Sequence, residues 1–504
     1  MPNFARLMPR AWPLAIIAAW YLLCYFTNAS TPSPQAPGWW SWWDQSQYYR
    51  ATADLAHGRL VPENYWFGYP LLGVPFYGLM PRHPYLIPNL VLILMICGAF
   101  FAACRQVVGR VEAWLLIILF IALDPFLPAT LVIPWNTLPA YATLYFSTYR
   151  LLFRQPVLRD FALCAWLTAV ALLARPTEIF PLACVYLAGG FRLVDPRQRY
   201  AALTFFGLAA GSVAAICAAL NFHLYGDWRS PYMITESSKF HRENIGLKAY
   251  QLLFDGTFLT GQAALPDMTT WSLCERFPLF LFCLPGAVWL VREKGWPTLG
   301  LPLAIIASVL FYLTYSTFAN MPFFWTYSSY HYIWWIVPWL GLFTYLTVRR
   351  ARTQLPPALF LATLLGPPLA FVLVAFGTKT VDSNLHFTSS YAEGNFVVDL
   401  VPSTTVQAQD IRLEFQTPPS YQGLGTSVAY DAKVTVSING RRQSTMADYF
   451  MSQYGAVFDF SFLVHGLSLQ PGDRVEICFG DTAPPVLAHA ALLDITRRPW
   501  RFAR

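Results

Sequence analysis

Long apolar runs alternate with shorter polar segments over the first three quarters of the chain. We interpret each run as a membrane-crossing helix, and prolines in the intervening loops blur the boundaries by several residues. We predict eleven spans, at residues 11–26, 85–104, 113–131, 137–153, 160–175, 177–191, 201–222, 277–291, 296–316, 331–348 and 356–377.

Basic residues gather in alternate loops between these runs. With the N-terminus inside, every inside loop is short and basic. In chain order, the five inside loops contain Arg105 and Arg110; Arg150, Arg154 and Arg159; Arg192, Arg197 and Arg199; Arg292 and Lys294; and Arg349, Arg350 and Arg352. This bias predicts a cytoplasmic N-terminus. An odd number of spans then places residues 378–504 outside the membrane, which is the periplasm in a bacterial inner membrane.

The pattern changes near residue 377, where alternation of apolar and polar residues replaces the long runs. The alternation predicts strands at 395–400, 410–416, 432–438, 457–464 and 474–479, with a hairpin turn at Asn439-Gly440. We therefore predict a soluble all-β domain over residues 378–504, a sandwich of the jelly-roll type.

Composition supports a polytopic α-helical membrane protein. Of the 504 residues, 56% are hydrophobic and 12% are charged, whereas soluble domains carry about 25% charged residues. The net charge of +7 lies mostly in short loops where it sets topology, so it does not indicate a nucleic-acid partner. No Cys/His cluster has the spacing of a zinc site.

Two polar segments on the predicted outer side are long, at residues 28–84 and 223–276. Long loops of this kind usually carry function. The first contains the tryptophans at positions 39, 40, 42 and 43, which suit the membrane–water interface, and directly after them the carboxylate of Asp44. A carboxylate on the wet side of this interface can abstract a proton beside a lipid-borne substrate. The alternative is that Asp44 is the N-cap of a short helix beginning at Gln45.

Several motifs on the outer side occur in a fixed order. They are Gly68-Tyr69-Pro70-Leu71-Leu72, Ala174-Arg175-Pro176-Thr177, Asn221-Phe222-His223-Leu224-Tyr225-Gly226-Asp227 and Tyr330-His331-Tyr332-Ile333-Trp334-Trp335. With the acidic residue early in the first outer loop, residues 1–377 resemble the GT-C superfamily of integral-membrane glycosyltransferases, among them arabinofuranosyltransferases, aminoarabinose transferases and protein O-mannosyltransferases. The resemblance implies a GT-C fold, with the two long outer loops forming the active site.

The resemblance also implies the chemistry. Such enzymes move a hexose or pentose from a polyprenyl-phosphate carrier to a glycan, lipid or protein acceptor of the cell envelope. Because the lipid phosphate is already a good leaving group, one general base suffices for an inverting displacement. Asp44 matches the family's first-loop acid and is the predicted base. Asp124, at the outer end of the third span, is either the second acid of some relatives or a helix-end residue before Pro125.

The donor phosphate requires positive charge at membrane level. Arg175 is the leading candidate because its planar fork suits phosphate. Lys239, His241 and Arg242 in the second long loop are further candidates, with a solvated face as the alternative. His331 lies in the region where many relatives carry an arginine, and packing between aromatic residues is its alternative role.

No cofactor or metal ligand is assigned. Metal-assisted relatives use two adjacent acids in the first loop, whereas Gln45 follows Asp44 here, so a divalent cation (Mg²⁺, Mn²⁺ or Ca²⁺) stays open. Two other functions also stay open. A transporter or flippase for a lipid-linked sugar should show internal repeats, which the sequence lacks. An enzyme of the O-antigen-ligase type would gather several arginines in one outer loop, whereas here they are scattered.

Overall fold

The structure is a computed structural model. It describes residues 4–27, 43–61, 67–124, 131–237, 240, 245–254, 272–315 and 330–375, followed by 381–382, 386–392, 395–401, 406–416, 434–443, 447–454, 457–470, 472–479 and 486–494. The chain divides into two compact units. One comprises residues 1–241, 282–315 and 330–355, and the other comprises residues 242–281, 316–329 and 356–504.

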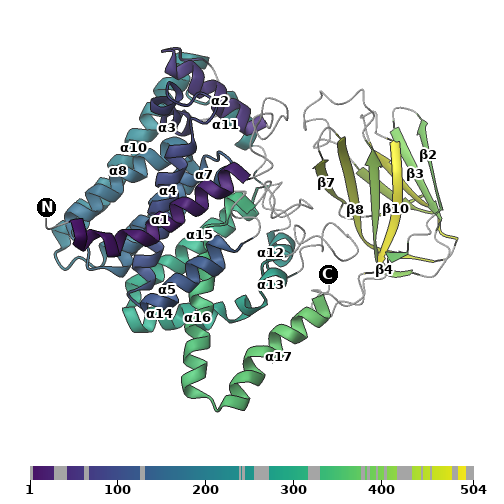
Figure 1. The fold of residues 1–504 in the computed structure, drawn as a ribbon. Helices are drawn as coiled ribbons and strands as arrows, with labels where there is room; N and C mark the ends of the chain where they lie inside the picture. The colour runs from purple at the N-terminus through teal and green to yellow at the C-terminus, as the bar shows by residue number, and fades with distance from the viewer. Residues whose placement is uncertain are drawn as a thin grey trace. The chain divides into compact units, whose positions relative to one another are not determined.

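The first unit is helical (Figure 1). Its helices are α1 (Phe4–Thr27), α2 (Trp43–Ala56), α3 (Gly68–Tyr77), α4 (Leu86–Cys104), α5 (Arg110–Ile117), α7 (Thr137–Ser147), α8 (Leu158–Ala174), α9 (Ile179–Gly190), α10 (Pro196–Tyr225), α11 (Pro231–Ser237), α14 (Cys283–Lys294), α15 (Gly300–Leu313) and α16 (Ile336–Gln354). α5 and α7 continue as π-helical segments, Ile118–Ala122 and Thr148–Phe153, and 3₁₀ turns lie at Pro176–Glu178, Trp296–Leu299 and Tyr330–Tyr332.

Each of the eleven predicted apolar runs overlaps one of these helices or α17 (Pro357–Ala375) of the second unit. Within the described residues, three helical segments are both long and apolar enough to cross a membrane: Leu86–Cys104, Pro196–Tyr225 and Trp296–Leu313. Shorter apolar helices lie at Pro13–Thr27 and Pro357–Val372. The number of eleven spans therefore stays a prediction.

α7 forms the centre of the first unit. It is buried at every residue except Phe146, although the sequence Thr137–Ser147 contains several hydroxyl groups. Two of them are used to hold another element, because the Tyr141 hydroxyl donates to the His331 carbonyl at 2.8 Å and the Tyr145 hydroxyl donates to the Trp335 carbonyl at 2.7 Å. These bonds satisfy buried polar groups and fix the segment that precedes α16.

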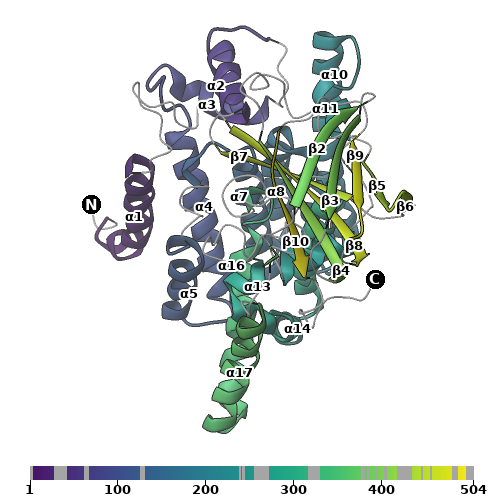
Figure 2. The ribbon, with the colours of Figure 1, turned by 90° about the vertical axis from the view of Figure 1, so that its right-hand side faces the viewer.

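The second unit contains the helices α12 (Ile245–Leu253), α13 (Leu273–Arg276) and α17, and ten strands. The strands are β1 (Val381–Asp382), β2 (His386–Ala392), β3 (Asn395–Val401), β4 (Val406–Gln416), β5 (Val434–Ile438), β6 (Arg441–Gln443), β7 (Ala447–Tyr454), β8 (Val457–Leu469), β9 (Val475–Phe479) and β10 (Val486–Asp494). They form two antiparallel sheets of five strands, ordered β1-β10-β4-β8-β7 and β2-β3-β9-β5-β6, which Figure 2 shows as arrows of green to yellow.

Strands β3, β4, β5, β8 and β9 overlap the five runs in which apolar and polar residues alternate. The predicted hairpin is confirmed: β5 and β6 pair with Ile438 opposite Arg441. Asn439 has φ 50° and Gly440 has φ 76°, as a two-residue turn between twisted strands requires. The jelly-roll arrangement stays a prediction.

Candidate functional site

α2 carries Asp44 in its first turn, because the helix begins at Trp43. The alternative prediction, that Asp44 is the N-cap of a helix beginning at Gln45, is therefore wrong. A carboxylate in the first turn is favoured by the helix dipole instead. Gln45, Tyr48 and Thr52 are buried on one face of α2, and the Gln45 side chain donates to the Pro134 carbonyl at 3.1 Å. This face fixes the rotation of the helix about its axis.

A cluster of tyrosines (Tyr48, Tyr69 and Tyr85) ties α2 to α3 and α4. The rings of Tyr69 and Tyr85 are stacked, with centroids 4.6 Å apart and planes at 3°. The Tyr85 hydroxyl donates to the Tyr48 carbonyl at 2.9 Å and lies 2.6 Å from the Thr52 hydroxyl. The Tyr69 hydroxyl donates to Asn89 Oδ1 at 3.0 Å. Because all of these groups are buried, the tyrosine cluster holds α2 in one position.

The Gly68-Tyr69-Pro70 motif begins with a glycine because α3 lies against the backbone of α8 at this position. A Cβ atom at Gly68 would lie 2.1 Å from the backbone carbon of Leu173. α3 can therefore contact the backbone of α8 directly, immediately before α8 ends. Through this close packing, the motif fixes the positions of α3 and α8 relative to each other.

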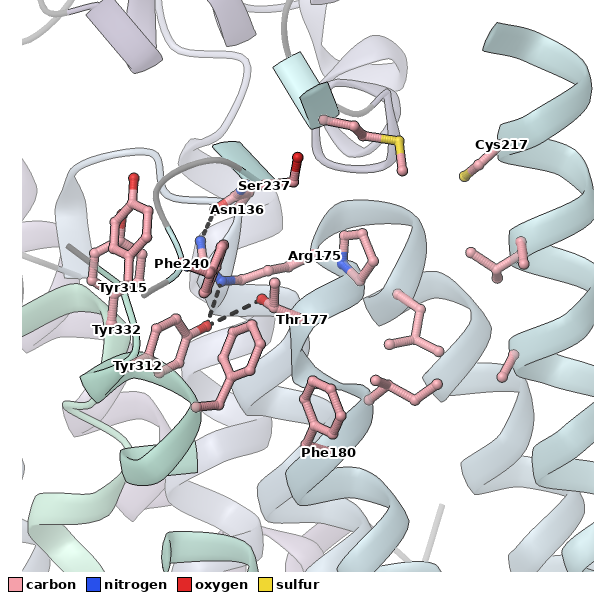
Figure 3. A pocket seen from close by; sticks show the side chains of 18 of the residues that line it. Asn136, Arg175, Thr177, Phe180, Cys217, Ser237, Phe240, Tyr312, Tyr315 and Tyr332 are labelled. Carbon is pink, nitrogen blue, oxygen red and sulfur yellow. Dashed lines mark hydrogen bonds between the residues drawn. The ribbon is translucent and has the colours of Figure 1, made fainter. Parts of the chain in front are cut away.

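Arg175 follows the last residue of α8 and has an extended backbone, with φ −152° and ψ 94°. Pro176 comes next and opens a 3₁₀ turn, which is consistent with the extended conformation that a residue before proline adopts. The guanidinium is held by two side chains from distant elements: Nη1 donates to Asn136 Oδ1 at 2.8 Å, and Nε donates to the Tyr312 hydroxyl at 3.0 Å. Figure 3 shows both bonds.

Glu178 supplies the counter-charge to Arg175. Nε of Arg175 lies 3.4 Å from Glu178 Oε1, and the exposed fractions of the two side chains are 12% and 2%. The Tyr312 hydroxyl donates to the same carboxylate oxygen, and the Arg175 guanidinium lies over the Tyr332 ring at 4.6 Å. Within the described residues these contacts engage Nε and Nη1 of Arg175, and none engages Nη2. The arginine is oriented while part of its fork stays available.

His331 lies between aromatic rings. It is 4% exposed, its ring stacks on Trp135 with centroids 4.0 Å apart, and the Tyr332 ring centroid lies 3.9 Å away on the following residue. This packing agrees with the aromatic alternative stated for His331, although the side chain also lines the cavity described next.

One cavity of about 820 Å³ joins these residues. Its polar side chains include Asp44, Asn136, Arg175 and His331. Its apolar wall comes from the end of α8, the start of α9 and one face of α10, and consists of Leu172, Ile179, Phe180, Ala210, Val213, Ala214, Cys217 and Ala218. In Figure 3 Cys217 points from α10 toward the cavity, opposite Tyr312, Tyr315 and Tyr332.

Both long polar segments of the sequence contribute to this cavity. The segment 28–84 provides Asp44 and Tyr48, and the segment 223–276 provides Trp228, Met233, Ser237 and Phe240. Lys239, His241 and Arg242 lie outside the described residues, so their predicted role is neither supported nor opposed. Asp124 is 2% exposed and is not among the residues that line the cavity.

Two residues of the site, Asn136 and Tyr312, were not singled out in the sequence, whereas Tyr332 belongs to the motif at residues 330–335. Asn136 gives a weak signal, because it is an amide beside an apolar run, but a tyrosine at the end of a span looks like any interfacial aromatic. Among the described residues, no group of three or more His, Cys, Asp or Glu side chains could hold a metal ion.

Comparisons with known proteins give little. No protein-family model matches the sequence, and no curated protein is significantly similar to it. Among solved structures, the chain is similar to ArnT from Cupriavidus metallidurans bound to undecaprenyl phosphate, with 14% identity, a TM-score of 0.42, and coverage of 73% of this chain and 71% of that chain.

Proposed function

We propose that this protein is a membrane glycosyltransferase of the GT-C type, which moves a sugar from a polyprenyl-phosphate carrier to an acceptor hydroxyl. The observation that carries the proposal is the single cavity in which a carboxylate (Asp44), an oriented arginine (Arg175) and an extended apolar wall meet. The arginine can bind the phosphate, the apolar wall can hold the polyprenyl chain, and the carboxylate can accept the proton of the attacking hydroxyl.

Arg175 is the proposed phosphate ligand. Asn136 and Tyr312 hold its Nη1 and Nε, so little side-chain freedom remains to be lost when the donor binds. Glu178 balances its charge. The apolar face of α10, with Ala210, Ala214 and Ala218, is made of small side chains that leave room for a branched isoprenoid chain.

Asp44 is the proposed general base. The acceptor oxygen attacks the anomeric carbon and forms the new C–O bond, while the bond between that carbon and the phosphate oxygen breaks. The lipid phosphate leaves with the bonding electrons, and the acceptor proton moves to the Asp44 carboxylate. A single displacement of this kind inverts the anomeric configuration.

The remaining assignments belong to the same proposal. Lys239, His241, Arg242 and His331 would supplement Arg175 at the phosphate, whereas Asp124, which does not line the cavity, is given no role in this reaction. The protein would lie in the bacterial cytoplasmic membrane with residues 378–504 in the periplasm, as the basic inside loops indicate. The sugar could be a pentose, as in arabinofuranosyltransferases, or a hexose.

The test is donor consumption. The full-length protein in nanodiscs is incubated with a panel of polyprenyl-phosphate sugars and cell-envelope glycan, lipid and protein acceptors, and release of polyprenyl phosphate and the anomeric configuration of the product are measured. We expect one donor to be consumed with inversion. If donors cross the bilayer of proteoliposomes intact and none is consumed, the protein is a flippase and the proposal is wrong.

A further inference from the structure

A second cavity lies between α14 and α16, formed by a different set of residues from the Arg175 cavity. Its volume is about 730 Å³, and the side chains that matter for its chemistry are Leu284, Val288, Trp289, Arg292, Arg350 and Gln354. None of these residues has a role in the proposed transfer reaction.

The two helices run in the same direction. Near the start of α14, Gly286 meets Phe343 so closely that a Cβ atom there would lie 1.7 Å from the Phe343 carbonyl oxygen. One turn later on α14 and two turns later on α16, Trp289 meets Arg350. The helices therefore end on the same side of the first unit. Both end in basic residues, with Arg292 and Lys294 in the last turn of α14 and Arg352 in the last turn of α16.

The basic end of this cavity suits an anion. The Arg350 guanidinium lies over the Trp289 ring, 4.4 Å from its centroid, and this stacking fixes the arginine beside the exposed Arg292. No Asp or Glu is among the described residues that line the cavity. The helix C-termini favour arginines at this place, but that preference alone does not require a cavity or a stacked tryptophan between them.

The other end of the cavity is apolar and open. Leu284 is 71% exposed and Val288 is 46% exposed, on a helix whose buried side is Gly286, Ala287 and Leu290. In a chain with other helices long and apolar enough to cross a membrane, exposed apolar side chains beside a cavity suit contact with an acyl chain. The ligand must therefore carry an anionic group at one end and an apolar chain at the other.

We propose that this cavity binds an anionic glycerophospholipid, with its phosphate between Arg292 and Arg350, its glycerol against Trp289, and an acyl chain along Val288 and Leu284. Basic pockets between membrane helices commonly hold such headgroups. The site is independent of the transfer reaction and would be present whatever sugar the protein handles.

The experiment uses the delipidated full-length protein in detergent and measures binding of dioleoyl phosphatidylglycerol against dioleoyl phosphatidylcholine by native mass spectrometry. The parent protein should prefer phosphatidylglycerol. Arg292→Gln and Arg350→Gln should each weaken phosphatidylglycerol binding by about fivefold and leave phosphatidylcholine binding unchanged. The double variant Arg292→Lys/Arg350→Lys keeps both charges and should retain most of the preference.

The matched control is Arg110→Gln/Arg197→Gln, which removes two exposed arginines from outside the cavity. It should leave the preference intact. An equal loss in the control would mean that overall charge attracts the lipid and would overturn the proposal. Displacement of the bound lipid by soluble glycerol phosphate would also overturn it, because the site would then be one for a free anion.

Discussion

Two arginine–carboxylate pairs of the first unit differ in burial and in length. Arg175 and Glu178 lie 3.4 Å apart at the end of α8, with side chains 12% and 2% exposed. Arg59, which follows α2, and Asp54, in the last turn of α2, lie closer, at 2.6 Å, with side chains 65% and 21% exposed. The shorter contact is the weaker one, because water screens an exposed pair and long side chains lose entropy in holding it. Burial, rather than distance, is what distinguishes the Arg175 pair from the Arg59 pair.

Removing the carboxylate from each pair should give the largest difference in stability. Glu178→Gln leaves the buried charge of Arg175 without its counter-ion, and we expect a loss of about 3 kcal/mol in the free energy of unfolding. Asp54→Asn should cost less than about 1 kcal/mol. Reversible unfolding in mixed micelles measures both. Equal losses of stability in the two variants would show that the buried pair contributes no more than the exposed pair.

Removing the arginine from each pair should separate them in donor binding. Arg175→Ala should raise the dissociation constant of the donor by about a hundredfold, since charge-assisted hydrogen bonds to the phosphate are lost. Arg175→Lys keeps the charge without the planar fork and should give a smaller increase. The control Arg59→Ala should bind the donor as the parent does. Unchanged affinity in both Arg175 variants would make this arginine purely structural.

Tyr312 is the link that only the buried pair possesses. Its hydroxyl accepts from Arg175 Nε and donates to Glu178, so Tyr312→Phe frees the guanidinium while keeping the ring. We expect donor affinity to fall by about tenfold, the worth of one hydrogen bond to a charged group. Tyr200→Phe, at a tyrosine of α10 that is 73% exposed, is the matched control. Equal affinities in the two variants would argue against orientation of Arg175 by Tyr312.

The smallest effect concerns salt. The pair of Arg59 and Asp54 is exposed, so the small destabilisation caused by Arg59→Gln should vanish in about 1 M NaCl, where charges are screened within about 3 Å. The destabilisation caused by Glu178→Gln should persist at that salt concentration, because the pair is buried. The free energies of unfolding of both variants are measured at low and high salt. If the destabilisation by Glu178→Gln also vanished at high salt, water would have to reach Arg175.

The sequence predicted the parts of this site that depend on local pattern. The apolar runs mark the helices, and Arg175 stands out as a cation between two runs. Asp44 stands out as a carboxylate after four tryptophans. The pairing of Arg175 with Glu178, one turn away, could be predicted and is confirmed. Two other partners could not be predicted in this way, because Asn136 and Tyr312 are 39 and 137 residues away in the chain. Only the packing of α7, α8 and α15 brings them together.

Local boundaries were also harder to predict than the elements themselves. The alternative role of Asp44, as the N-cap of a helix beginning at Gln45, is excluded because α2 begins at Trp43 and carries Asp44 in its first turn. Asp124 resembled Asp44 as an acid at the end of an apolar run, yet only Asp44 lines the cavity. Which acid reaches the cavity depends on the tyrosine cluster, whose contacts join three helices.

The central claim is that Asp44 is the general base, and Asp44→Asn tests it most directly. The exchange keeps the size of the side chain and its carbonyl oxygen as a hydrogen-bond acceptor, and weakens a favourable dipole interaction at the start of α2 by about 0.3–1 kcal/mol, so folding and donor affinity should be nearly unchanged. Turnover in nanodiscs should fall by about a hundredfold or more, whereas Asp54→Asn on the same helix should turn over as the parent does. Near-parent turnover by Asp44→Asn, with the donor bound normally, would contradict the account.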